Sequence, residues 1–245
     1  MSTPTVRQYV AGATADGAGV TVTLGAGTAS GDLLVIFHCN DYSTAALLPN
    51  PTSSQTLSGL TLRATGDQGT NTAHVKCWTA LTTVGGSQTV TGAAEGFEEV
   101  TVHVVVIDGS TINSSDFMDG AAGSQGPGSN SHVAPSVSPS TTDALLFCAA
   151  GSSSSSGSQT YTAPGGMTER TDVSDGLYGC VGSVASQILA ASGATGTKTF
   201  TCSAFTDFAT ASIAIKGGSG GGGPAVEPTV PIVRPNAAVT RAAVW

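Results

Sequence analysis

One strand-like segment occurs twice in this chain, and this repetition limits the possible folds more than any other feature. The first copy covers residues 31–39 (GDLLVIFHC), and a weaker copy covers residues 142–149 (TDALLFCA). Each copy is a short run of apolar, β-branched and aromatic residues that follows a turn residue and Asp, which predicts a buried β-strand. Alternate residues of the first copy face opposite sides, and both sides are apolar. This strand therefore needs cover on both faces.

The segments that follow each copy also match, with offsets that vary only by the length of a loop. The matched landmarks are Asp32 and Asp143 (offset 111), Gly59 and Gly166 (107), Cys77 and Cys180 (103), and Gly109 and Gly217 (108). Two copies are too few for a repeat array, which needs about three units to bury a continuous core. We therefore expect two similar halves folded into one body, with both copies of the strand in its interior.

The composition favours an all-β fold. Gly, Ser, Thr, Ala and Val dominate, and charged residues make up only 10% of the chain, against about 25% in average globular proteins. We predict a duplicated antiparallel β-sandwich of jelly-roll type over residues 1–217, with almost no helix. Its halves are expected at 20–109 and 133–217. The bridge between them, 110–132, is expected to lead into an arm or short strand around 133–137.

The composition changes abruptly at the end of this body. Residues 218–223 are glycine apart from Ser219, and four prolines follow between 224 and 235. Such a sequence predicts a flexible linker and then an extended segment, 224–245, since closely spaced prolines exclude helix and stiffen the chain. Its apolar residues suggest an arm that binds a neighbouring subunit, with a disordered tail as the alternative. The predicted contact residues are Val230, Ile232, Val233, Arg234, Arg241 and the anchor Trp245.

Charge and cysteine content narrow the environment. The net charge is −8 and the Lys and Arg residues are scattered singly, so a nucleic-acid partner is not expected. The N-terminus lacks the pattern of a secretory signal, and no run approaches the length of a membrane span. We therefore expect cytosolic assembly. The cysteines, which we predict to be buried and reduced because they are widely spaced without a CxxC pair, are Cys39, Cys77, Cys148, Cys180 and Cys202.

Residues of metal-binding type gather around the first strand copy. They are His38, Cys39, Asn40 and Asp41, with His74, Cys77 and His103 further along the chain. Neighbouring residues of a strand point to opposite faces, so His38 and Cys39 cannot both bind one ion without a bulge. The sequence therefore predicts no metal site and no cofactor.

Acidic residues offer two further candidate sites. Glu95, Glu98 and Glu99 with Asp67 would suit glycoside hydrolysis, which uses two carboxyl groups, but we interpret the three glutamates as a solvated loop. Asp116 and Asp119 lack the spacing of an EF-hand calcium loop. Outside the Gly-rich linker the chain contains no nucleophile elbow, zinc signature, Walker loop or dinucleotide fingerprint. We therefore predict a protein that is not an enzyme.

A sugar-binding surface is the sharpest ligand hypothesis. The aromatic residues Tyr42, Trp78, Phe97 and Tyr161 are candidates for stacking on a glycan, although core positions also explain them. The matched loops of the two halves, 40–58 and 151–165, carry Tyr42 and Tyr161, which are the candidate ligand contacts.

Several of these motifs together resemble a known family. The motifs are Gly-Asp-Leu-Leu-Val at 31–35, Gly-(Leu/Met)-Thr-x-Arg at 59–63 and 166–170, Val-Val-Ile-Asp-Gly at 105–109 and Ile-Ala-Ile-Lys-Gly at 213–217. Over residues 20–217 the chain is similar to two-repeat β-sandwich virion proteins of tailed bacteriophages that infect actinobacteria. That resemblance implies a tail-fibre, minor-tail or head-decoration module that assembles in the host cytoplasm and has no catalytic residues.

We therefore expect a non-enzymatic structural protein at the surface of a tailed-phage virion, either a minor tail protein or a capsid decoration protein. Its expected partners are other virion proteins and further copies of itself, with no nucleic acid and no membrane. The alternative is a carbohydrate-binding adhesin that contacts a host-surface glycan through the loops 40–58 and 151–165.

Overall fold

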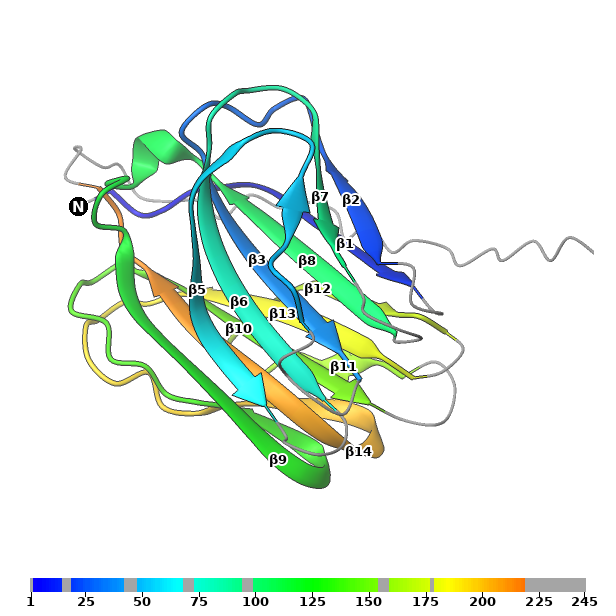
Figure 1. The fold of residues 1–245 in the computed structure, drawn as a ribbon. Coiled ribbons are helices and arrows are strands. Elements are labelled where there is room, and N and C mark those ends of the chain that lie inside the picture. Colours follow the sequence, from blue (N-terminus) through cyan, green and yellow to red (C-terminus); the bar gives the residue numbers. More distant parts are fainter. Residues whose placement is uncertain are drawn as a thin grey trace, which may run out of the picture.

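The structure is a computed structural model that describes residues 2–14, 19–41, 48–67, 73–93, 99–153, 159–176 and 179–218. Strands make up most of this described part, and helical structure in it is limited to the 3₁₀ turn η2 (Gly109–Thr111). The predicted all-β class is confirmed (Figure 1).

The first half is a jelly roll of eight strands. They are β1 (Val6–Thr14), β2 (Val20–Leu24), β3 (Leu33–Asn40), β4 (Thr52–Ser53), β5 (Leu57–Asp67), β6 (His74–Thr82), β7 (Gln88–Gly92) and β8 (Val100–Ile107). A large sheet has the order β1-β8-β3-β6-β5, and a small sheet, here called the first cap, has the order β2-β7-β4. The chain passes back and forth between the two sheets, as in a jelly roll.

The second half repeats this plan with fewer, longer strands. They are β9 (Met118–Ala134), β10 (Leu145–Ser153), β11 (Tyr161–Thr162), β12 (Thr168–Ser174), β13 (Val181–Ile188) and β14 (Lys198–Ile215). The large sheet has the order β9-β14-β10-β13-β12. The second cap consists of 131–134 of β9, 198–202 of β14, and β11.

The residue pairs show that the two halves are copies. Val6 pairs with Ile107 and Met118 with Ile215, while Leu24 pairs with Gln88 and Ala134 with Lys198. Strand β9 therefore occupies the positions of both β1 and β2, and strand β14 occupies those of both β7 and β8. Both copies of the repeated strand, β3 and β10, are the middle strand of their large sheet, so their predicted interior position is confirmed.

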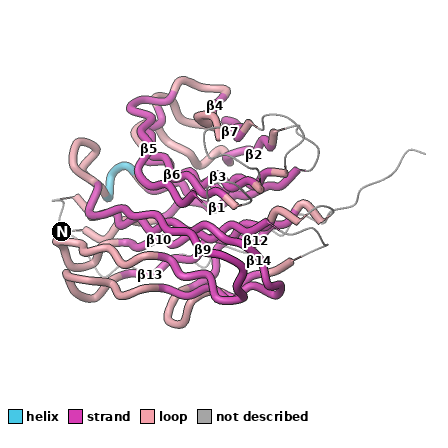
Figure 2. Tube along the Cα trace, turned by 60° about the horizontal axis from the view of Figure 1, so that its bottom comes forward, coloured by secondary structure: helices cyan, strands magenta, loops and turns pink. Residues whose placement is uncertain are grey.

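The molecule consists of four layers, with the two large sheets stacked between the two caps (Figure 2). Leu33, Val35, Phe37 and Cys39 face the second half in the central core. The opposite face of β3 lies under the first cap, where Leu34 and Ile36 contact Val90 and other cap residues. The cover that the sequence required thus comes from the second half and from the cap of the same half.

Two matched arginines connect the halves. Arg63 and Arg170 both lie at a register shift, in β5 and β12, and their Nε atoms donate to Thr79 at 2.7 Å and to Ser186 at 2.8 Å. Each guanidinium also lies over a ring of the other half. Arg63 is 5.5 Å from the ring centre of Phe117, and Arg170 is 5.1 Å from that of Tyr9. The halves are therefore related by an approximate two-fold axis.

The register corrects two of the matched landmarks. Leu33 and Leu145 both pair with the last isoleucine of their half, so equivalent residues of β3 and β10 differ by 112 (145 − 33). Asp143 therefore takes the place of Gly31, and both have a positive φ, 60° and 86°, while Asp32 corresponds to Ala144. Cys180 precedes β13, so it is not the counterpart of Cys77 in β6.

The predicted boundaries of the halves are also corrected. Strand β1 lies before residue 20 yet belongs to the first large sheet, and most of the predicted bridge, 110–132, is strand β9. β9 consists largely of Gly, Ser and Ala and so carries no apolar signal. Its small residues are needed because β9 approaches β5 backbone to backbone, and a Cβ atom on Gly123 would overlap the Thr65 carbonyl.

Candidate interaction surfaces

The last described residue, Gly218, lies beside the N-terminal residue Ser2. The Ser2 backbone N–H donates to the Gly218 carbonyl at 3.0 Å, and the Gly218 N–H donates to the Thr111 carbonyl at 2.8 Å. Next to this point, Lys216 and Asp116 form an ion pair of 2.8 Å. All six predicted arm contacts, Val230 to Trp245, lie outside the described residues, so their role stays a prediction.

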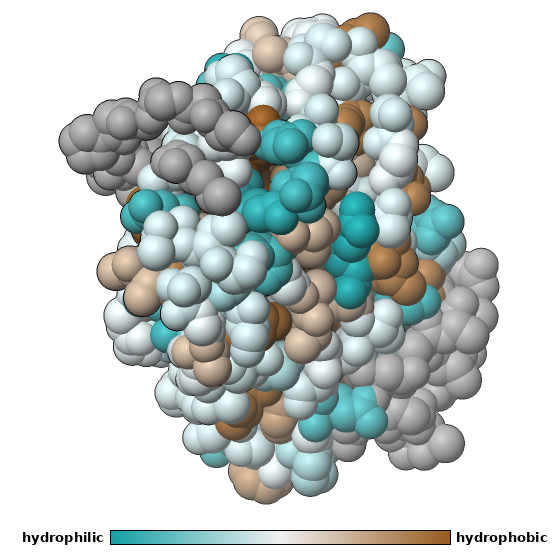
Figure 3. Space-filling view, turned by 90° about the vertical axis from the view of Figure 1, so that its left-hand side faces the viewer, coloured by the Kyte–Doolittle hydropathy of each residue, from teal (hydrophilic) through white to brown (hydrophobic). Residues whose placement is uncertain are grey.

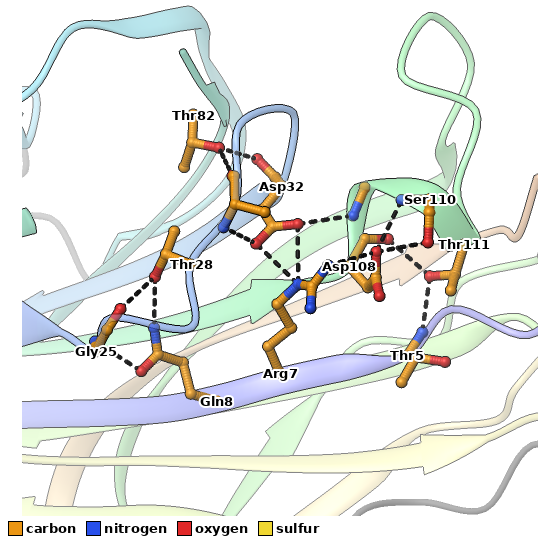
Figure 4. A network of polar contacts seen from close by, with 12 residues as sticks. Thr5, Arg7, Gln8, Gly25, Thr28, Asp32, Thr82, Asp108, Ser110 and Thr111 are labelled. Carbon is orange, nitrogen blue, oxygen red and sulfur yellow. Dashed lines mark hydrogen bonds and ion pairs between the residues drawn. The ribbon is translucent and has the colours of Figure 1, made fainter. Parts of the chain in front are cut away.

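A polar network holds this end of the first half together (Figure 4). The Asp32 carboxylate is 1% exposed; it accepts the backbone N–H of Ala29 at 2.7 Å and that of Gly109 at 3.0 Å. Arg7 Nε lies 3.0 Å from Asp32, and the same guanidinium binds Asp108 at 2.9 Å. These contacts link β1, the start of β3 and η2.

In the second half a different carboxylate binds the backbone N–H groups of the corresponding turn. Asp119 occupies the position of Arg7 (119 − 7 = 112) and accepts the backbone N–H groups of Ser140 at 2.9 Å and Thr141 at 3.1 Å. Partial burial opposes ionisation of Asp119, but the hydrogen bonds from Ser140 and Thr141 outweigh it and lower the pKa of this carboxyl group. Asp119 is thus a structural cap of the turn, and Asp116 is paired with Lys216.

A groove of about 400 Å³ lies between β1 and β2, lined by residues 9–13 and 20–23. Consecutive residues of each strand line it, so strand edges as well as side chains form its walls. The walls carry Val, Ala, Gly and Thr with the Tyr9 ring, and no charged residue is among those that line it. The groove is therefore an apolar channel between the large sheet and the first cap.

The second half fills the corresponding positions with rings. His132 stacks on Phe208 with ring centres 4.4 Å apart, and a Cβ atom on Gly126 would overlap Phe208. The equivalent residues of the first half are the smaller Val22 and Val100 (132 − 110 and 208 − 108); Val22 lines the groove, whereas Val100 belongs to the buried core under the first cap. The groove thus distinguishes the first half from its copy.

The structure corrects the proposed role of Tyr161 in glycan stacking. Tyr161 is 4% exposed, its hydroxyl is 2.8 Å from His132 Nδ1, and its ring packs edge-on against Phe200. Trp78 is equally buried, and its Nε1–H donates to Asn50 Oδ1 at 3.2 Å. Both are core residues, whereas Tyr42 and Phe97 lie outside the described residues.

The residues of metal-binding type are divided between two layers. Cys39 belongs to the central core, whereas His38 lies near Trp78 on the cap side, with ring centres 6.1 Å apart. Burial lowers the pKa of both His38 and His103 to about 3. Within the described ranges, no three His, Cys, Asp or Glu residues are grouped so that they could hold a metal ion.

Glu99 differs from the expected solvated loop residue. It is 9% exposed, and its backbone N–H donates to Asp41 Oδ1 at 3.3 Å. Burial, and then hydrogen bonding and repulsion from Glu99, raise the pKa of Asp41 to about 8. Sequence reasoning missed this pair because Asp41 and Glu99 are distant in the chain and meet only where β3 ends and β8 begins. Glu95 and Glu98 lie outside the described residues.

Most of the surface in Figure 3 is weakly polar, with separate hydrophilic and hydrophobic patches. Among the described residues, no helix is long and apolar enough to cross a membrane. Comparisons with protein-family models, with curated proteins and with solved structures gave no significant match to this chain.

Proposed function

We propose that this chain is a non-enzymatic structural protein of a tailed-bacteriophage virion, exposed at the surface as a minor tail or capsid decoration protein. It would be made in the host cytoplasm and bind other virion proteins and further copies of itself.

The observation that carries this proposal is a four-layer body followed by a C-terminal sequence of contrasting composition. Gly218, the last described residue, is hydrogen-bonded to Ser2 and Thr111, and 27 residues (245 − 218) follow it. Within these, the segment 224–245 combines prolines with apolar residues, which suits an extended arm better than a solvated tail. A compact module with one external arm is suited to assembly.

Two of the acidic residues that were candidates for calcium binding have structural partners. Asp119 binds two backbone N–H groups, and Asp116 pairs with Lys216; Asp32, a landmark of the duplication, also binds two backbone N–H groups. The burial of Tyr161 removes one of the two residues on which the adhesin alternative depended, so that alternative is not proposed further.

Removal of the arm tests the proposal. A chain that ends after Gly223 should fold with an unchanged circular dichroism spectrum but should not enter particles in a complementation assay. A chain in which residues 224–245 are replaced by Gly and Ser at equal length is the matched control, and it should fail in the same way. Normal incorporation of the truncated chain would contradict the proposal.

A further inference from the structure

We infer that the groove between β1 and β2 receives residues 236–245 of a second copy of this chain, which add as a strand beside β2. This inference rests on the proposed function, in which residues 224–245 form an assembly arm.

Strand β2 offers one open edge. It is the terminal strand of the first cap, where Val20–Leu24 pair with β7 on one side. Among the described strands, none pairs with its other side. An exposed edge of this kind binds an extended segment through main-chain hydrogen bonds. The β2 edge borders the groove, so an added strand would lie over it.

The groove suits apolar side chains. Residues 9–13, which include Tyr9 and Val10 as well as three small residues, form its β1 wall, and a Cβ atom on Gly12 would lie 2.8 Å from Val20 Cγ2. The side chains of Val20 and Val22 therefore pack against Gly12, and the groove of about 400 Å³ lies beside this contact. Alternate side chains of an added strand would point into this space.

The sequence of the arm indicates that its last part, residues 236–245, is the segment that could add as a strand. Prolines at 224, 228, 231 and 235 have no N–H, so residues 224–235 cannot form a continuous ladder. Residues 236–245 (NAAVTRAAVW) contain no proline and one charged side chain, Arg241. Val239 and Val244 are β-branched and favour a strand. This stretch can hydrogen-bond along its whole length.

The length of the arm favours a second copy over the same chain. The arm leaves the body beside Ser2, close to the start of β1. β1 has nine residues and is about 30 Å long, whereas the proline-rich residues 224–235 extend over about 37 Å at ~3.1 Å per residue. An extended spacer is therefore long enough for residue 236 to reach beyond the chain's own groove to that of a second copy.

The overall charges do not oppose binding of the arm to a second copy. The whole chain has a net charge of −8, and residues 219–245 contain Glu227, Arg234 and Arg241. The arm is therefore +1 and the rest of the chain is −9. Each copy has one groove of this kind in its first half and one arm, so the contact is head to tail and builds a ring or a filament.

Cross-linking with a short bismaleimide tests this contact. The two variants are Thr21→Cys, on β2 beside the groove, and Thr240→Cys, in the arm. The five native cysteines are buried, so the introduced thiols are the reactive ones. The matched control is Ser131→Cys, which is equally exposed at the equivalent position of the second cap (131 − 21 = 110).

We expect a mixture of the Thr21→Cys and Thr240→Cys proteins to give a covalent heterodimer in at least fivefold higher yield than the mixture with Ser131→Cys. Equal yields, or no heterodimer, would overturn the inference. A double variant that cross-links only within one chain, independently of dilution, would also overturn it.

The two proposals fail separately. If the arm is needed for incorporation into particles but no cross-link forms at Thr21, the groove assignment is wrong and the virion role stands. If the cross-link forms but particles lack the protein, the pairing stands and the virion role is wrong.

Discussion

Replacement of Asp32 by Asn should destabilise the protein far more than the same change at Asp143. Asp32 is 1% exposed and uses both carboxylate oxygens to bind the N–H groups of Ala29 and Gly109 and the Arg7 guanidinium. An Asn has one acceptor oxygen, so one buried N–H loses its partner, which costs about 1–3 kcal/mol. The loss of the ion pair adds up to about 1 kcal/mol, because Arg7 is 34% exposed and the pair is partly screened.

We therefore expect a loss of about 3 kcal/mol in the free energy of unfolding. With a denaturant slope of about 3 kcal/mol per M, this lowers the midpoint of urea unfolding by about 1 M. Asp143 is exposed and has φ 60°, a conformation that Asn tolerates, so Asp143→Asn should change stability by less than about 0.5 kcal/mol. Similar losses for the two variants would refute the argument that Asp32 organises the turn.

Three further predictions concern packing, protonation and thiol reactivity. Gly123→Ala should destabilise the protein by more than about 2 kcal/mol, because the new Cβ atom would overlap the Thr65 backbone carbonyl. Gly27→Ala, which has open space around it, should not destabilise the protein. The midpoints of urea unfolding measure both effects. Burial lowers the pKa of His38 and His103 from the ordinary histidine value of 6.5 to about 3. Between pH 6.5 and 3 the unfolded chain therefore binds more protons than the folded chain, and the free energy of unfolding should fall as the pH drops through this range. This fall, measured by urea titration at several pH values, should be shallower in His38→Leu; an unchanged slope would contradict the assignment. The five cysteines are buried, so thiol titration should detect none before denaturation and five after it.

The strongest strands could be predicted from sequence, because their side chains are apolar on both faces. β3 and β8 are buried along their whole length, and such runs give a clear signal. β9 gave none, since it packs through its backbone and needs Gly and Ser where other strands need Val or Ile. Composition thus reveals strands that pack through side chains and misses those that pack through the main chain.

The register of the duplication was beyond sequence matching. Asp32 and Asp143 look equivalent in their motifs, but the first binds Arg7 and the second replaces Gly31 at a positive φ. The carboxylate that binds the turn comes from Asp32, just before β3, in one half and from Asp119, in β9, in the other. Motif matching cannot detect this exchange, because both halves keep a carboxylate that binds the turn but place it at different sequence positions.

The candidate site was predictable only in part. The sequence predicts an arm after residue 217, and the structure shows Gly218 hydrogen-bonded to Ser2 and Thr111, while the arm itself lies outside the described residues. The groove that we propose as its receptor depends on which strands lie at sheet edges and on Val22, which is smaller than the equivalent His132. Both features depend on how distant segments of the chain pack together, and the residue pattern within a single strand does not predict this.

Quantitative mass spectrometry of purified particles tests the central claim most directly. The proposed function predicts that phage particles purified by density gradient contain this chain, at hundreds of copies for a decoration protein or a few copies for a tail protein. Absence of the chain from particles, while it accumulates in infected cells, would contradict the account.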